Sequence, residues 1–132
     1  MKLEYLLTQL DKLNLSKGEY AITGSAAMAA RGIREAKDID IVITKKLFQE
    51  LKNQYPSDQH LYNDTLHLGK IDAMANFTTP NLPSADQQVA TAEIINGYRV
   101  LNLEILIKLK KYLGREKDLA DVKLIDNYLQ NI

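Results

Sequence analysis

The stretches that decide the fold are residues 20–25, YAITGS, and residues 38–44, DIDIVIT. In the first, a short apolar strand runs into a turn of small residues. In the second, a strand carries two carboxylates. Because side chains alternate along a strand, Asp38 and Asp40 point to the same face. Two carboxylates on one face repel each other unless a cation lies between them, so the pair predicts a divalent metal site.

A third carboxylate lies in another apolar run, residues 70–74, KIDAM. If this strand neighbours the strand of the acid pair, Asp72 meets Asp38 and Asp40. Three converging acids could hold two metal ions, an arrangement that suits in-line phosphoryl transfer. The sequence therefore favours a site for a divalent metal and a phosphate group.

Plainer alternatives stay open for the same residues. Gly24 and Ser25 permit close backbone approach and precede free helix N–H groups, which favours phosphate. Ser25 is also a good N-cap for the alanine-rich segment 26–30, so taken alone the pair is better explained by an ordinary strand-to-helix turn. The two aspartates fit an exposed sheet face beside Lys37 or Arg34, and the third acid fits a strand edge.

The remaining pattern predicts one domain, residues 1–132, of the α/β or α+β class. We expect a small mixed sheet flanked by helices, with a helical pair at the C-terminus. Apolar spacing predicts helices over residues 2–13, 26–30, 45–54, 103–113 and about 116–130. Alternation and turn residues predict strands over 20–23, 38–44, 61–69 and 70–77, and a hairpin over 92–100 with an Asn-Gly turn.

Lys110 projects from the apolar stripe of its predicted helix, and a lysine on a buried face needs a partner. A substrate phosphate or Asp118 could serve, unless the lysine snorkels at the edge of the stripe. Asp118 falls on the apolar arc of the last helix, where it is either functional or a counter-charge to the helix N-terminus. His60 and His67 lack metal-ligand spacing, so histidine catalysis is only weakly supported.

Composition excludes several classes of protein. The 17 basic residues balance the 17 acidic ones, so nothing indicates nonspecific affinity for nucleic acid or membranes. The absence of cysteine excludes disulfides and thiolate chemistry. The first residues, MKLEYLLTQL, are typical neither of a signal peptide nor of a membrane span, so we expect a cytoplasmic protein with no membrane partner.

These motifs resemble the DNA polymerase β-like nucleotidyltransferase superfamily. Its pattern is a hydrophobic residue, Gly-Gly or Gly-Ser, then Asp-h-Asp-h, then a later h-Asp-h, where h is hydrophobic. The matching residues are 23–25, 38–41 and 71–73, with Thr23 in place of the usual hydrophobic residue. Within it, the chain is most similar to small prokaryotic proteins related to lincosamide nucleotidyltransferases and to the nucleotidyltransferase toxins of type IV toxin–antitoxin systems.

Two further features carry this resemblance. Arg34 matches an arginine that precedes the acid pair in those proteins. A C-terminal pattern of Lys, five residues and Arg-x-Lys-Asp-x-x-Asp appears as Lys110 and then Arg115, Asp118 and Asp121, with four residues between the lysine and the arginine. Many relatives carry further C-terminal helices that shape the acceptor pocket, so acceptor recognition here could need a dimer or a partner.

The resemblance implies a nucleoside triphosphate substrate and two Mg²⁺ ions, with Mn²⁺ as an alternative. Asp38 and Asp40 would hold the metals against the triphosphate, and Asp72 would bind the catalytic metal and help deprotonate an acceptor hydroxyl. Nucleotide binding is assigned to Gly24, Ser25, Arg34 and Lys110, with support from Arg115, Asp118 and Asp121. The products would be a nucleotidylated acceptor and pyrophosphate.

Three functions therefore remain open. The first is an active nucleotidyltransferase that acts on a small molecule, an RNA or a protein. The second is a binding module with this fold and no turnover, serving as a toxin–antitoxin partner or a nucleotide sensor. The third is a structural α/β domain whose acids are incidental. The sequence names neither the acceptor nor the preferred nucleotide, and it leaves a homodimer and an antitoxin complex equally open.

Overall fold

A mixed β-sheet organises the chain, of which the computed structural model describes residues 2–132. Its strands are β1 Tyr20–Thr23, β2 Asp40–Ile43, β3 Ser57–Gln59, β4 Asp64–Leu68, β5 Ile71–Ala75, β6 Glu93–Ile95 and β7 Tyr98–Val100. The helices are α1 Leu3–Lys12, α2 Gly24–Ala29, α3 Lys45–Leu51, α4 Ala85–Ala90, α5 Leu103–Leu113 and α6 Glu116–Gln130. No helix within residues 2–132 is long and apolar enough to cross a membrane.

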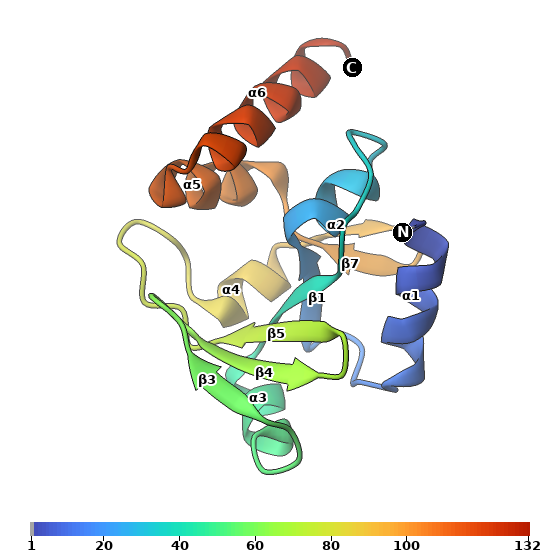
Figure 1. Ribbon diagram of the computed structural model, residues 1–132, viewed down its shortest axis with the longest axis vertical. Helices are drawn as coiled ribbons and strands as arrows, with labels where there is room; N and C mark the ends of the chain where they lie inside the picture. The colour runs from blue at the N-terminus through green and yellow to red at the C-terminus, as the bar shows by residue number, and fades with distance from the viewer. Residues whose placement is uncertain (1) are drawn as a thin grey trace.

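The strands lie in the order β3-β4-β5-β2-β1-β7-β6. The β2–β5 and β1–β7 pairs are parallel, and the remaining neighbours are antiparallel. In Figure 1 the C-terminal pair, α5 and α6, lies beyond one end of the sheet, and α6 extends away from the body of the molecule. This arrangement confirms the predicted mixed sheet with flanking helices and a C-terminal helical pair.

The central strands are buried on both faces. Every residue of β1 is buried, and in β2 only Asp40 is partly exposed. Helices α2 and α4 both pack against these two strands. A strand covered on both faces is continuously apolar rather than alternating, so a polar residue placed there stands in an environment of low polarity.

Several local predictions are confirmed. The Asn96-Gly97 turn joins β6 and β7, and both residues have the positive φ that a tight hairpin turn requires, 50° and 85°. Asn102 caps α5, because its side-chain oxygen accepts a hydrogen bond from the Ile105 N–H at 2.9 Å. The predicted last helix matches α6.

Other predictions are wrong in detail. Ser25 does not cap α2, which begins at Gly24, two residues before the predicted start, with Thr23 in the N-cap position. Asp38 lies ahead of β2 instead of within it. Helix α3 ends at Leu51 and not at residue 54. The edge strand β3 and the short helix α4 were not predicted at all.

Candidate active site

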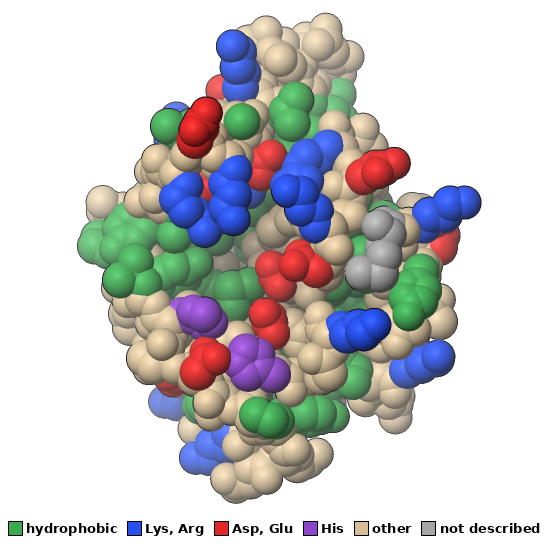
Figure 2. All heavy atoms as spheres, viewed as in Figure 1, with side chains coloured by type: hydrophobic (Ala, Val, Ile, Leu, Met, Phe, Trp, Pro, Cys, Tyr) green, Lys and Arg blue, Asp and Glu red, His purple; other side chains and the backbone are tan. Residues whose placement is uncertain are grey.

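Two of the three acids lie opposite each other on neighbouring parallel strands. In the β2–β5 register Asp40 is paired with Asp72, as expected if these strands are neighbours. Asp38 is exposed and lies two residues ahead of Asp40. Figure 2 shows acidic side chains in the middle of a hollowed face, between basic side chains above and the two histidines below. The sheet therefore brings Asp40 and Asp72 together, while the chemical role of the three acids stays a prediction.

Asp40 is in an electrostatically unfavourable position. Its carboxylate forms no hydrogen bond with any side chain or backbone group in residues 2–132. Burial, followed by the neighbouring charges of Asp38 and Asp72, raises the pKa of Asp40 to about 7, against the lowering effect of Lys110. A partly buried carboxylate without a hydrogen-bond partner is one that a cation would stabilise.

The turn after β1 is pressed against this carboxylate. Gly24 has a φ of +65°, and a Cβ atom there would lie 3.4 Å from Oδ2 of Asp40. The positive φ therefore favours glycine, whereas a Cβ atom at this distance would make only an ordinary van der Waals contact with the carboxylate. The Ser25 hydroxyl accepts a hydrogen bond from the Lys37 N–H at 3.2 Å, which ties the turn to the loop that leads to Asp38.

The raised pKa of Asp40 predicts a pH-dependent cost to stability in metal-free protein. The unfolded chain ionises this carboxyl near pH 4, whereas the folded chain holds the proton until about pH 7. In that window the folded state binds more protons, so the free energy of unfolding falls as the pH rises. Relative to wild type, Asp40→Asn should gain about 2–3 kcal/mol between pH 5 and pH 8.

Urea unfolding in the presence of EDTA measures this difference. Asp126→Asn makes the same change at an exposed position of α6 and controls for the loss of one charge. The same pH dependence in wild type and Asp40→Asn would contradict the prediction.

The basic residues of the predicted site are held by acids of α6. Lys110 is buried and donates to Asp121 at 2.8 Å, and Arg34 donates to the same carboxylate through Nε and Nη2 at 2.9 and 3.1 Å. These hydrogen bonds lower the pKa of Asp121, although burial opposes them. Of the alternatives left open for Lys110, Asp118 as its partner is therefore wrong, because Asp121 takes that place.

Asp118 instead accepts from Arg115, with contacts of 2.6 and 3.2 Å, and is almost fully buried. Arg31, which precedes Arg34 by three residues in the sequence, lies elsewhere. Its guanidinium donates to the Ala27 and Leu101 carbonyls, so it supports the fold.

Two adjoining cavities meet at Asp40. One, of about 240 Å³, is bordered by the turn at Gly24, the acids Asp38 and Asp40, and Lys110. The other, of about 460 Å³, extends past Asp72. Both are lined by Asp40, Tyr62, Met74, Leu113 and Arg115. Asp40 therefore stands at the junction of a space beside Lys110 and a space beside Asp72.

Sequence reasoning missed His67, which contacts Asp72 directly. The Nδ1 atom of His67 lies 2.8 Å from Oδ1 of Asp72, and its Nε2 atom lies 2.7 Å from Oδ2 of Asp58. Hydrogen bonds to Asp72 and then to Asp58 raise the pKa of His67. The signal was available, since the short turn at Gly69 between the two predicted strands sets His67 opposite Asp72.

The acids fit Mg²⁺ in kind, because this ion prefers carboxylate oxygens. However, no three or more His, Cys, Asp and Glu side chains within residues 2–132 are grouped so that they could hold a metal ion alone. Mg²⁺ commonly binds through one or two carboxylates together with substrate phosphates and water. The unpartnered carboxylate of Asp40 therefore fits a metal ion that arrives with a nucleotide.

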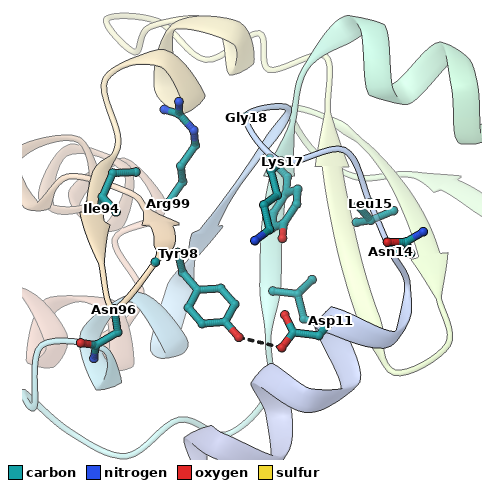
Figure 3. Close-up of a pocket in the computed structure, with 12 residues that line it drawn as sticks. Asp11, Asn14, Leu15, Lys17, Gly18, Ile94, Asn96, Tyr98 and Arg99 are labelled. Carbon is teal, nitrogen blue, oxygen red and sulfur yellow. Dashed lines mark hydrogen bonds between the residues drawn. The ribbon is translucent and has the colours of Figure 1, made fainter.

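A larger cavity, of about 600 Å³, lies away from the acids. Figure 3 shows it between the end of α1, the loop at Gly18 and the β6–β7 hairpin. The Tyr98 hydroxyl donates to Asp11 at 2.8 Å, and this bond raises the pKa of Tyr98 to about 12. None of the predicted site residues lines this cavity, so size alone does not make it the candidate site.

Comparison with known proteins identifies the fold. No protein-family model matches the chain, and no curated protein matches its sequence. A candidate nucleotidyltransferase from Thermotoga maritima has a similar structure, with a TM-score of 0.58 and 17% identity over 98% of this chain and 93% of that one. The ANT(2″)-Ia enzyme, solved with adenylyl-2″-tobramycin, gives a TM-score of 0.54 and 19% identity over 94% and 85%. The chain therefore has the nucleotidyltransferase fold.

Proposed function

We propose that the chain is a metal-dependent nucleotidyltransferase, which moves a nucleoside monophosphate from a nucleoside triphosphate to a hydroxyl acceptor. The observation that carries the proposal is the pairing of Asp40 with Asp72 on parallel strands, with the Gly24 turn against Asp40. The shared fold supports it. ATP is the first donor to test, since ANT(2″)-Ia was solved with adenylyl-2″-tobramycin.

The acids carry the chemistry in this proposal. Asp38, Asp40 and Asp72 would hold two Mg²⁺ ions, or Mn²⁺, which when bound supply charge neutralisation on the triphosphate. Asp72 takes the proton of the acceptor hydroxyl as the acceptor oxygen forms its bond to the α-phosphorus. The bond from the α-phosphorus to the bridging oxygen breaks, and pyrophosphate leaves with that oxygen.

The cavity on the Gly24 side would hold the triphosphate. Gly24 and Ser25 allow the phosphates to approach the backbone, and Lys110 and Arg34 supply positive charge. Lys110 uses one of its three N–H donors on Asp121, so two remain for phosphate oxygens. The cavity beside Asp72 would hold the acceptor, whose chemical class stays undetermined.

A second candidate function is nucleotide binding without turnover. It is favoured by the ion pairs, because Arg34 and Lys110 share Asp121 and Arg115 is bound to Asp118. Carboxylates thus already neutralise part of the positive charge beside the acids. A second copy of the chain or an antitoxin protein as partner, and a cytoplasmic location, stay predictions of the resemblance.

Calorimetric titration tests the proposal. ATP, GTP, CTP and UTP are titrated with Mg²⁺ into wild type, Asp40→Ala and the control Asp126→Asn. We expect Mg²⁺-dependent binding in wild type and the control, and binding at least ~10-fold weaker in Asp40→Ala. Pyrophosphate release then separates the two candidates: release supports transfer, and binding without release supports the nucleotide-binding module. No binding by any of these proteins would contradict both.

A further inference from the structure

Asp58, His67 and Asp72 form a chain of contacts across three neighbouring strands. Asp58 is on β3, His67 on β4 and Asp72 on β5. The imidazole stands between the carboxylates, with Nδ1 2.8 Å from Asp72 and Nε2 2.7 Å from Asp58. Because contacts on both sides fix the plane of the ring, Nδ1 is aimed at one oxygen of Asp72, Oδ1.

Apart from His67, few contacts fix the position of the Asp72 carboxylate. Its side chain is 48% exposed, and its contact with His67 is its only hydrogen bond within residues 2–132. An aspartate with that much freedom populates more than one rotamer unless a partner selects one. Asp40 differs, since it is packed between β1 and β5 and against Gly24.

We propose that His67 is a positioning residue, which binds Oδ1 of Asp72 and thereby presents Oδ2 to the reaction centre. Asp58 contacts the other nitrogen of the imidazole, Nε2, and so fixes the orientation of the ring. The inference rests on the proposed function, because it gives His67 a task only if Asp72 binds the catalytic metal and takes the acceptor proton. Mutating a residue that hydrogen-bonds to a metal ligand typically lowers metal affinity or activity by about 10- to 100-fold.

The test measures Mn²⁺ binding and needs no knowledge of the acceptor. Electron paramagnetic resonance of free Mn²⁺ gives the affinity of the weaker metal site in protein saturated with a non-hydrolysable ATP analogue. The variants are His67→Leu, His67→Gln, which retains an N–H donor, and Asp72→Ala. Asp64→Ala is the matched control, because it removes an aspartate of β4 whose carboxylate accepts a 2.7 Å hydrogen bond from Asn76, the residue that follows β5. By strand alternation the Asp64 side chain points to the face of the sheet opposite to His67.

We expect Asp72→Ala to abolish the weaker Mn²⁺ site and His67→Leu to weaken it about 10- to 100-fold, with His67→Gln between His67→Leu and wild type. Asp64→Ala should bind as wild type does. Wild-type affinity in His67→Leu, beside a loss in Asp72→Ala, would overturn the inference and leave the proposed function intact. Failure of wild type to bind Mn²⁺ and the nucleotide analogue would overturn both.

Discussion

Replacing Asp72 by asparagine should lower the rate of pyrophosphate release about 10³-fold, because a positioned general base contributes ~10²–10⁴-fold to such a step. The amide would keep the shape of the carboxylate side chain, and the register with β2 would be unchanged. The acceptor hydroxyl, however, would lose the group that takes its proton. Nucleotide affinity should change by less than about threefold, since Asp38, Asp40 and Gly24 are untouched.

Two separate measurements distinguish nucleotide affinity from the rate of pyrophosphate release. ATP affinity is measured by calorimetry, and release of pyrophosphate is followed with whichever acceptor supports turnover in wild type. A loss of affinity as large as the loss of rate would show that Asp72 serves nucleotide binding instead of the chemical step. Full activity in Asp72→Asn would rule out a role as base.

The second large effect is expected at Asp121, on the stability of the fold. Asp121→Ala would leave Lys110 buried without a counter-charge and take from Arg34 its bidentate partner. Breaking a buried ion pair by removing one member commonly costs about 3–5 kcal/mol. We expect ~3 kcal/mol here, because the Arg34 side chain is 25% exposed and regains some hydration.

Urea unfolding at pH 7 measures the loss. The control is Glu104→Ala, which breaks the exposed pair between Glu104 and Lys108 on α5 and should cost no more than about 0.5 kcal/mol. The fold lowers the pKa of Asp121 below its ordinary value near 4. The stability that this carboxylate contributes is therefore present above about pH 4, and it is lost as the pH falls through the lowered pKa of the folded state. Adding Lys110→Met to Asp121→Ala should recover part of the stability. A loss below about 1 kcal/mol would contradict the burial argument.

Much of the fold followed from the sequence because its signals are local. The hairpin turn at Asn96-Gly97 and the cap at Asn102 each have a single favoured structure. Strand β3 escaped prediction because its residues, Ser57–Gln59, are polar and exposed and show no alternation. Helix α4 escaped because Pro80 and Pro83 indicate a loop, whereas its capping box lies just beyond them.

The site was predictable in its acids and less so in its partners. Parallel pairing of two strands was enough to bring Asp40 and Asp72 together. Sequence could not choose between Asp118 and Asp121 as the partner of Lys110, since both fall on the buried side of α6. That choice depends on where α5 and α6 contact each other, which no local pattern encodes.

The triangle of Arg34, Lys110 and Asp121 has a consequence for how such chains diversify. Arg34 comes from the loop before β2, Lys110 from α5 and Asp121 from α6. The Asp121 carboxylate therefore connects the loop that leads to Asp38 and Asp40 with both C-terminal helices. A change at any of these positions leaves a charge that the other two must accommodate. Among related sequences these positions should therefore covary, and the last helix should evolve together with the acid cluster.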